Sequence, residues 1–482
     1  MLIDERLFKM EETRQLTSEA EKRYRDYGIH VNEQRAIPCD IDGLKPVARR
    51  ALWTIRDLGG FSNAKLQKTA VYVGRCMGVY HPHGDASISD TYTTLVNTPH
   101  QLVYGEGNWG SISDKQAAAM RYTLLKLTKF SEKLFFDKFY LPVTPQVPNY
   151  DDSSVEPLYL NALLPNILLN GTLGIGVGVS VQLPSFTLKS VCTTLIKALK
   201  AKKITAKDCM GLEYKFLYGG RSIENKQEHL RLIKNGKGRI ESISVYEKAK
   251  EKNVYHITLF APFSDLAKAI EKTAQNKDVV RINDISDVKD KYGRVEITLK
   301  KGLGDSYQKT VMDKIVSTTF GATGNYDIKV TKRTKRKDGT GKSELRSSNI
   351  IDILETWIAY RIKLEKKACT YWIDKRQKEI DYLNLMRLAV KNRKFIIQAL
   401  DKPFNDEQLA AFLSKKLKIT VEQANIILDL KVRSLKALED KTLVRKIKAL
   451  KEEIGGYKIR ISKPRAYIAK QIKELYEEFK NV

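Results

Sequence analysis

The stretch that decides how this chain is interpreted is Gln116-Ala-Ala-Ala-Met-Arg-Tyr-Thr123, which lies about 40 residues after Tyr80-His-Pro-His-Gly-Asp85. A phenol such as that of Tyr122 can attack a phosphodiester as a nucleophile. The neighbouring Arg121 can neutralise charge that grows on the phosphate oxygens, and imidazoles can hold or protonate the phosphate. The two stretches therefore predict phosphoryl transfer through a tyrosine. A lone tyrosine after an arginine is more commonly an ordinary core or surface residue, so the prediction depends on the neighbouring motifs.

Those motifs are Arg35-Ala-Ile-Pro-Cys-Asp-Ile-Asp-Gly-Leu-Lys-Pro-Val-Ala-Arg-Arg50 and Gly105-Glu-Gly-Asn-Trp-Gly-Ser111. In this order and spacing, the four motifs resemble the DNA-cleaving subunit of type IIA topoisomerases, the gyrase A and topoisomerase IV C-subunit family. Weaker similarity continues through Asn170-Gly-Thr-Leu-Gly-Ile-Gly-Val-Gly178, Asn235-Gly-Lys-Gly-Arg-Ile240 and Glu422-Gln-Ala-Asn-Ile-Ile-Leu-Asp-Leu430. The resemblance covers nearly the whole chain.

The resemblance implies a type II DNA topoisomerase that passes a duplex through a transient double-strand break. Tyr122 would form a 5′-phosphotyrosyl link and Arg121 would stabilise the transition state. The residues implied to be catalytic are Tyr122, Arg121, His81 and Arg35, and those implied to contact DNA are Lys45, Arg49, Arg50, His83 and Leu183. Leu183 would wedge between base pairs and bend the duplex. A TOPRIM/ATPase partner subunit would bind Mg²⁺ and ATP, and this chain would form a homodimer on double-stranded DNA.

Two glycine-rich segments invite nucleotide-binding interpretations that their spacing does not support. Gly174-Ile-Gly-Val-Gly178 has the wrong glycine spacing for a dinucleotide-binding turn. Gly339-Thr-Gly-Lys-Ser343 imitates the end of a phosphate-binding P-loop, but Arg336 occupies the position where such a loop requires a glycine. No ATP site is therefore predicted in this chain.

The composition agrees with a polyanionic partner. The 482 residues include 85 Lys and Arg against 57 Asp and Glu, a net charge of +28. The apolar run Leu163 to Val181 is broken by Pro165 and several glycines, so no membrane span is predicted. The N-terminus lacks the apolar core of a signal peptide, which predicts a cytoplasmic protein. Five scattered cysteines without a Cys-x-x-Cys pair, and only six histidines, predict neither disulfides nor a metal site.

The predicted fold class is multidomain α+β. Residues 1–30 predict a helical arm, and residues 31–153 a winged-helix breakage–reunion domain that carries Tyr122. Residues 154–348 predict an α/β tower domain, which includes a basic exposed turn from Lys329 to Lys342. Residues 349–399 and 436–482 predict the arms of a long antiparallel coiled coil, the second interrupted at Gly455-Gly456 and Pro464. Residues 400–435 predict a small helical knob for dimerisation, around Ile426–Leu435.

Within the winged-helix region the apolar spacing predicts helices from Pro46 to Gly59, at about 65–77 and at about 85–97. Pro46 suits the first position of a helix, and the Gly59-Gly60 pair suits its end. The third helix has a slim polar face that includes Ser87, Asp90 and Thr94, which fits a DNA major groove. An ordinary amphipathic surface helix would show the same pattern.

Two other classes of protein remain as alternatives. A metal-dependent nickase of the relaxase type also uses a His-x-His pair and a tyrosine, but it needs a third histidine, for which His100 is the candidate. A DNA-architectural protein would account for the charge and the wedge but not for the pair Arg121-Tyr122. The length, without a C-terminal β-propeller, resembles the medium subunit of T-even-type phage topoisomerases. A shortened bacterial chain would show the same length.

Overall fold

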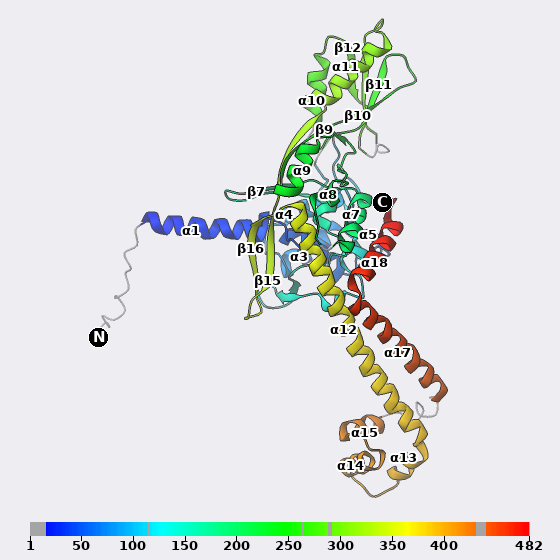
Figure 1. Ribbon diagram of the computed structural model, residues 1–482. Helices are drawn as coiled ribbons and strands as arrows, with labels where there is room; N and C mark the ends of the chain where they lie inside the picture. Colours follow the sequence, from blue (N-terminus) through cyan, green and yellow to red (C-terminus); the bar gives the residue numbers. More distant parts are fainter. Residues whose placement is uncertain are drawn as a thin grey trace, which may run out of the picture. The chain divides into compact units, whose positions relative to one another are not determined.

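The computed structural model describes residues 16–113, 116–201, 203–262, 265–287, 292–429 and 440–481. By their contacts these residues form two compact units. Unit 1 comprises the chain as far as Arg361 and resumes at Ile468, and unit 2 is the intervening segment Ile362–Tyr467. Helices and strands alternate through unit 1, whereas the described part of unit 2 is helical (Figure 1). The predicted multidomain α+β class is therefore confirmed.

The first part of unit 1 combines helices with a three-stranded antiparallel sheet of order β1-β3-β2. Its elements are α1 (Leu16–Val31), the π-helix η2 (Asn32–Ala36), α2 (Pro46–Asp57), β1 (Gln67–Lys68), α3 (Thr69–Val79), α4 (Asp85–Val96), β2 (Val103–Glu106) and β3 (Leu124–Leu127). Helix α2 begins at Pro46, and Gly59, with a φ of +72°, follows its end. Helix α4 buries Ile88 and Tyr92. The three predicted helices are confirmed, except that the second begins four residues later than expected.

The middle of unit 1 contains a five-stranded sheet of order β6-β7-β14-β9-β8. Its strands are β6 (Thr172–Ile175), β7 (Ser180–Leu183), β8 (Arg221–Ser222), β9 (Lys237–Ile243) and β14 (Ala322–Asp327). The helices of this region are α5 (Lys129–Phe135), η3 (Leu141–Val143), α6 (Asn166–Asn170), α7 (Leu188–Lys200), α8 (Ala206–Cys209) and α9 (Lys226–Asn235), and a small hairpin joins β4 (Gln146–Pro148) to β5 (Val155–Pro157). Strands β6 and β7 form a hairpin in which Thr172 pairs with Leu183 and Ile175 with Ser180.

A second, four-stranded antiparallel sheet of order β10-β11-β13-β12 lies in the predicted tower region. Its elements are β10 (Val245–Lys248), β11 (Val254–Leu259), α10 (Leu266–Ala274), β12 (Val279–Asp284), β13 (Val295–Leu299) and α11 (Asp305–Thr318). The two helices and the sheet share one core, which includes Ile257, Phe260, Ile297 and Met312. Ile112, from the distant segment between β2 and β3, is buried in that same core.

The basic segment from Lys329 to Lys342 is not the simple turn that was predicted. It belongs to a two-stranded hairpin of β15 (Lys329–Lys335) and β16 (Gly341–Ser347), which Figure 1 shows as a separate pair of strands. The two faces of the hairpin differ, with Thr331 and Ser343 buried and Lys332 and Lys342 exposed. The sequence prediction counted charge in this segment but overlooked the alternation.

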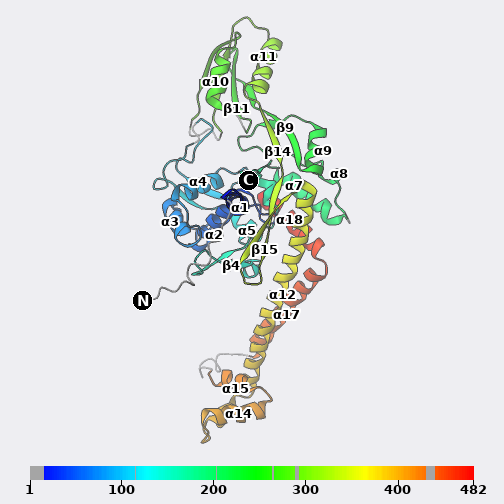
Figure 2. The same cartoon turned by 90° about the vertical axis from the view of Figure 1, so that its left-hand side faces the viewer.

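Helix α12 (Ile350–Lys391) is capped by Asn349, whose Oδ1 accepts from the Asp352 N–H at 2.9 Å. The remaining helices of the chain are α13 (Arg393–Leu400), α14 (Asp406–Leu417), α15 (Val421–Leu428), α17 (Asp440–Ser462) and α18 (Pro464–Phe479). Within unit 2, α12 and α17 run antiparallel, side by side in both views (Figures 1 and 2). The ion pairs Arg376–Glu453 and Glu365–Arg460 connect them at 2.8 and 2.6 Å.

Two predicted features of these helices were wrong. The first arm is not continuous to residue 399, because α12 ends at Lys391 and α13 begins at Arg393. The second arm continues through Gly455-Gly456 and breaks only at Pro464. A helical glycine costs about 1 kcal/mol relative to alanine, and the adjacent Ile454, packed with Ile380 and Leu450, offsets that cost. The predicted knob residues 430–435 lie outside the described residues.

Helix α18 returns the chain to unit 1. The ring of Phe479 lies 5.3 Å from that of Phe130, and Gln471 Oε1 accepts from Arg361 Nη2 at 2.5 Å. Among the described helices, none combines the length and apolarity needed to cross a membrane.

Candidate active site

Tyr122 lies at the end of the segment 107–123, which connects β2 to β3. The segment is joined to the start of α3, because the N–H groups of Thr69 and Ala70 donate to the carbonyls of Thr123 and Met120 at 3.0 and 3.2 Å. Tyr122 is 67% exposed, and its hydroxyl has no hydrogen-bond partner in the part of the chain that the structure describes. The Arg121 guanidinium lies over its ring, 4.6 Å from the centroid. The two residues thus form an exposed pair on an anchored backbone.

A second contact holds the same segment at Ile112 and Ser113. Ile112 is 3% exposed and buried in the core of the four-stranded sheet, where a Cβ on Gly293 would come within 2.9 Å of it. Ser113 Oγ lies 3.4 Å from Ser286 Oγ. The segment that carries Tyr122 is therefore fixed to the tower region as well as to α3. Sequence reasoning missed Ile112, because an isolated apolar residue in a glycine-rich loop gives no local signal of a distant core.

His81 and His83 lie at the start of α4, with ring centroids 4.5 Å apart. His81 is 7% exposed, and its Nδ1 lies 3.1 Å from Arg50 Nη1. Burial, together with the charges of Arg50, His83 and Arg35, lowers the pKa of His81 to about 4. The imidazole is therefore neutral at pH 7. Because Nδ1 accepts from Arg50, the hydrogen lies on Nε2, and His81 can donate a hydrogen bond but is a poor proton source.

Arg50, predicted to contact DNA, is engaged within the protein. Its Nε and Nη2 donate to the two carboxylate oxygens of Glu156 at 2.5 and 2.7 Å, and Nη1 faces His81. A bidentate pair of this kind fixes the guanidinium. Arg50 therefore orients His81, and a direct contact of Arg50 with DNA stays a prediction.

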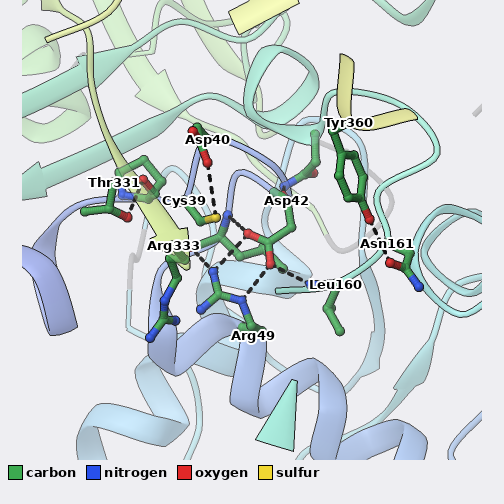
Figure 3. Close-up of polar contacts among 12 residues, drawn as sticks. Cys39, Asp40, Asp42, Arg49, Leu160, Asn161, Thr331, Arg333 and Tyr360 are labelled. Carbon is green, nitrogen blue, oxygen red and sulfur yellow. Dashed lines mark hydrogen bonds and ion pairs between the residues drawn. The ribbon is translucent and has the colours of Figure 1, made fainter. Parts of the chain in front are cut away.

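The prediction that Arg49 contacts DNA was wrong. Arg49 is 1% exposed and forms a buried ion pair with Asp42, at 2.6 Å from Nε to Oδ2 (Figure 3). Asp42 also accepts from the N–H groups of Leu44 and Leu160 at 3.0 and 2.9 Å. Two adjacent arginines look alike in the sequence, but only a partner 7 residues away, invisible to helical periodicity, decides which one is buried.

Arg35 and Lys45 lie where a polyanion can reach them. Arg35 is exposed, and Lys45 Nζ donates to the carbonyl of Leu173 at 2.6 Å. Burial lowers the pKa of Lys45. Both residues line a cavity of about 690 Å³ together with Ser87, Asp90, Thr91 and Thr94 from the polar face of α4. The structure therefore brings together the polar face of α4, Arg35 and Lys45, as predicted from separate motifs.

The prediction that Leu183 is an exposed wedge was wrong, because Leu183 is 3% exposed on β7. The exposed apolar side chains of this hairpin are on β6, with Leu173 58% and Ile175 81% exposed. Side chains of a strand alternate between two faces, so a shift in the assignment exchanges inside for outside. Ile175 is the most exposed apolar side chain of this hairpin.

The glycines beside Ile175 allow the hairpin to lie close to the N-terminal segment. A Cβ on Gly174 would be 2.1 Å from the Ala36 carbonyl oxygen, and one on Gly176 would be 2.0 Å from Asn32 Oδ1. Asn32 in turn donates to the Val177 carbonyl and accepts from its N–H, at 3.0 and 2.9 Å. The glycine spacing that imitates a nucleotide-binding turn therefore serves close backbone packing.

His100 is not a third ligand for the histidine pair. It is buried, its Nε2 lies 2.9 Å from the Phe186 carbonyl, and Lys215 Nζ lies 3.4 Å from its Nδ1. In the described part of the chain, no three His, Cys, Asp or Glu side chains come together as a group that could hold a metal ion. The described residues therefore do not fit the relaxase-type alternative.

Comparisons with known proteins identify the family to which the chain belongs. The sequence model for the A subunit of DNA gyrase/topoisomerase IV matches residues 35–476, so the chain belongs to this family. The predicted family is confirmed. The likeness to phage medium subunits stays a prediction.

Among individual relatives, the chain is 29% identical over 485 residues to the DNA gyrase A subunit of Kosmotoga olearia, covering 97% of this chain and 58% of the relative. It is 30% identical over 429 residues to the DNA topoisomerase 4 A subunit of Salmonella typhimurium, covering 87% and 55%. It is 28% identical to the chloroplastic/mitochondrial DNA gyrase A subunit of Nicotiana benthamiana, covering 96% and 49%. The chain spans about half the length of these relatives.

Proposed function

We propose that this chain is the DNA-cleaving and rejoining subunit of a type IIA topoisomerase, with Tyr122 as the nucleophile. The observation that carries the proposal is the exposed Arg121–Tyr122 pair on a segment anchored at two places. An exposed phenol without an internal hydrogen bond is available to a bound phosphate. The backbone hydrogen bonds of Met120 and Thr123 with the start of α3 limit the positions that it can take, which favours attack in a defined geometry.

In the proposed step, Tyr122 Oη attacks the phosphorus and the bond from phosphorus to the 3′ oxygen breaks. The phenol proton passes to solvent, and the departing 3′ oxygen becomes a hydroxyl by taking up a proton. The 5′ phosphate stays on Tyr122 as a diester, so reversal reseals the strand without an external energy source. Arg121 neutralises charge on the non-bridging oxygens, and neutral His81 donates its Nε2–H to a phosphate.

The duplex would lie against the polar face of α4, where Arg35 and Lys45 open into the same cavity. We assign α2 to α4 and the sheet β1-β3-β2 to a winged-helix DNA-binding domain, with the tower in residues 154–348. His83, exposed at the start of α4, is a further phosphate contact. The wedge role passes from Leu183 to Ile175, since an apolar side chain must be exposed to enter a base step.

The rest of the enzyme would come from other chains. Because the chain belongs to the A-subunit family, we assign Mg²⁺ and ATP to a TOPRIM/ATPase partner subunit. The metal supplies charge neutralisation at the phosphate when the partner is bound. The proposed location is the cytoplasm, or the host cytoplasm for a phage-encoded enzyme.

A double-strand break needs two tyrosines on opposite strands, so the proposed functional form is a two-fold homodimer. Contacts are expected near the winged-helix domain and at the knob around Ile426–Leu435. In the described part of that knob and beside it, exposed apolar side chains include Ile397, Leu400 and Ile426, which a partner copy could cover.

The proposal is tested by trapping the covalent complex. The full chain, its partner subunit, Mg²⁺ and end-labelled duplex DNA are mixed and denatured, and the labelled peptide is mapped. Paired, staggered breaks linked to Tyr122 are expected. Tyr122→Phe should abolish the adduct, whereas Tyr104→Phe, a control at a 45% exposed tyrosine on β2, should retain it. An adduct that persists in Tyr122→Phe contradicts the assignment.

A further inference from the structure

The β15–β16 hairpin carries cations that do not line the cavity beside α4. We propose that its exposed face and its connection form a second phosphate-contacting surface, for duplex DNA that extends beyond the cleaved segment. This inference rests on the proposed function, which supplies a long duplex as ligand. The hairpin carries eight cations, Lys329, Lys332, Arg333, Lys335, Arg336, Lys337, Lys342 and Arg346, against the two acids Asp338 and Glu344.

Four of the eight cations hold the hairpin in place. Lys329 forms an ion pair with Asp327, and Arg346 forms one with Asp40 at 2.8 Å. Lys335 Nζ donates to the carbonyl of Gln146 at 3.1 Å, and Arg333 Nη2 donates to the side chain of Gln34 at 3.4 Å. Burial lowers the pKa of Arg333 to about 10, which leaves it a cation at neutral pH. These contacts make the hairpin a fixed part of unit 1.

The other four cations, Lys332, Arg336, Lys337 and Lys342, are exposed. Their side chains make no hydrogen bond or ion pair with another described residue. Lys332 pairs in register with Glu344 and Thr334 with Lys342, so Lys332 and Lys342 lie on one face of the hairpin, opposite the buried Thr331 and Ser343. Arg336 and Lys337 extend the same charge into the connection between the strands.

Nearby acids neutralise this surface only in part. Glu33 of η2 lies close enough to Lys342 and Arg336 for their charges to act on its carboxylate. Asp338 Oδ1 accepts from the N–H and the hydroxyl of Thr340 at 2.9 and 2.6 Å, which engages it within the turn. Glu344 is one exposed carboxylate opposite Lys332. A net positive strip of this kind attracts a polyanion.

Phosphate is a better ligand for this strip than a protein surface. Specific protein interfaces have an apolar centre, whereas no large apolar side chain of the hairpin is exposed. The free cations all have long, solvated side chains, as at phosphate contacts that position a duplex without reading its sequence.

The attachment of the hairpin indicates where such DNA would lie. The Thr331 N–H donates to the Pro38 carbonyl at 2.8 Å, and the Thr331 carbonyl accepts from the Asp40 N–H at 3.0 Å (Figure 3). Thr331 thus sits beside the segment that begins at Arg35. At about 3.3 Å per residue, Arg336 and Lys337 lie roughly 15–20 Å further along the strand. A strip of that length can follow about five base pairs of duplex, and we expect it to contact DNA that continues past the catalytic cavity.

The test measures DNA affinity against salt concentration for the full chain, with a duplex of about 20 bp and one of about 50 bp. The variant carries Lys332→Gln, Arg336→Gln, Lys337→Gln and Lys342→Gln together. The control carries Lys441→Gln, Lys446→Gln, Lys448→Gln and Lys451→Gln, which are four exposed lysines of α17, outside the proposed dimerisation knob. Each neutralised phosphate contributes about 0.9 to the slope of log affinity against log salt. The variant should lose about 3 to 4 units of slope on the long duplex only, and the control none.

An unchanged slope on both duplexes overturns the proposal. So does an equal loss on both, which would place the cations at the catalytic cavity, or a loss confined to affinity for the partner subunit, which would make the hairpin a protein interface. Thermal unfolding at the wild-type temperature confirms that the exposed substitutions leave the fold intact. Covalent trapping at Tyr122 is measured separately, so the hairpin can fail while cleavage stands, or the reverse.

Discussion

Tyr122 and His81 lie in regions that are stabilised in opposite ways. Tyr122 is 67% exposed and contacts little besides Arg121, while its backbone is tied to α3 and, through Ile112, to the tower region. His81 is 7% exposed and rests on Arg50 and Glu156, next to the buried pair of Arg49 with Asp42. The comparison teaches that the reacting group is free and its backbone held, whereas the phosphate-holding group is fixed through its side chain.

The largest loss of stability is expected when the buried Arg49–Asp42 ion pair is broken. Asp42→Asn leaves Arg49 buried without its counter-charge, which costs about 3–5 kcal/mol of unfolding free energy. Urea unfolding measures the loss. Asp305→Asn, which breaks the exposed pair with Lys248, is the control and should produce no measurable change. Equal stability of the Asp42 variant and wild type would show that the Arg49–Asp42 pair does not stabilise the fold.

The exposed pair should respond in activity rather than in stability. Arg121→Ala is expected to lower the rate of DNA cleavage by a factor of about 10² to 10³, as removal of a charge-stabilising group does. Its unfolding should be unchanged, because the contact of the Arg121 side chain is with the exposed Tyr122 ring. Single-turnover cleavage and thermal unfolding are measured together, with Arg121→Lys as the variant that keeps the charge. If Arg121→Ala is destabilised but fully active, Arg121 supports the fold rather than the cleavage reaction.

The β6–β7 hairpin sharpens the same contrast between two neighbouring strands. Leu183→Ala should cost about 3 kcal/mol, because it empties a buried site. Ile175→Ala should leave stability unchanged and reduce the bending of bound DNA, measured by energy transfer between the ends of a labelled duplex. If Leu183→Ala alters bending while Ile175→Ala does not, the assignment of the wedge to Ile175 is wrong.

The smallest effect concerns pH. The pKa of folded His81 is about 4, below its ordinary value of 6.5. As pH falls from 6.5 towards 4, the unfolded chain binds a proton that the folded chain excludes, so stability decreases across that window. His81→Gln should lose less stability than wild type between pH 7 and 4.5, by calorimetry. The pKa of His100 is also lowered to about 4, so the variant should keep the part of the pH dependence of stability that His100 causes. An identical pH dependence would mean that His81 is protonated in the folded state.

Local signals in the sequence were sufficient for much of this fold. Pro46 begins α2 and Gly59 follows its end, because each acts on the backbone of its immediate neighbours. The family motifs named Arg35 and Lys45, which line one cavity in the structure, and their roles at DNA stay predictions.

The remainder depended on partners far away in the chain. Arg49 and Arg50 differ only in what they meet, Asp42 for one and Glu156 for the other. The helix through Gly455 depends on packing against α12, and the hairpin at Lys332 depends on an alternation that charge obscured. A local sequence pattern does not show which residues pair or pack with one another in the folded chain.

Unit 1 is interrupted in the chain by unit 2, and this order has a consequence during synthesis. The ring of Phe479 covers Phe130, and Gln471 meets Tyr140 and Arg361, yet both α18 residues follow the whole of Ile362–Tyr467. At a ribosomal rate of about 5–20 residues per second, those roughly 100 residues take about 5–20 s to make. During that interval the nascent chain exposes the apolar surface around Phe130 that α18 later covers. The packing of unit 1 is therefore complete only after α18 has been made.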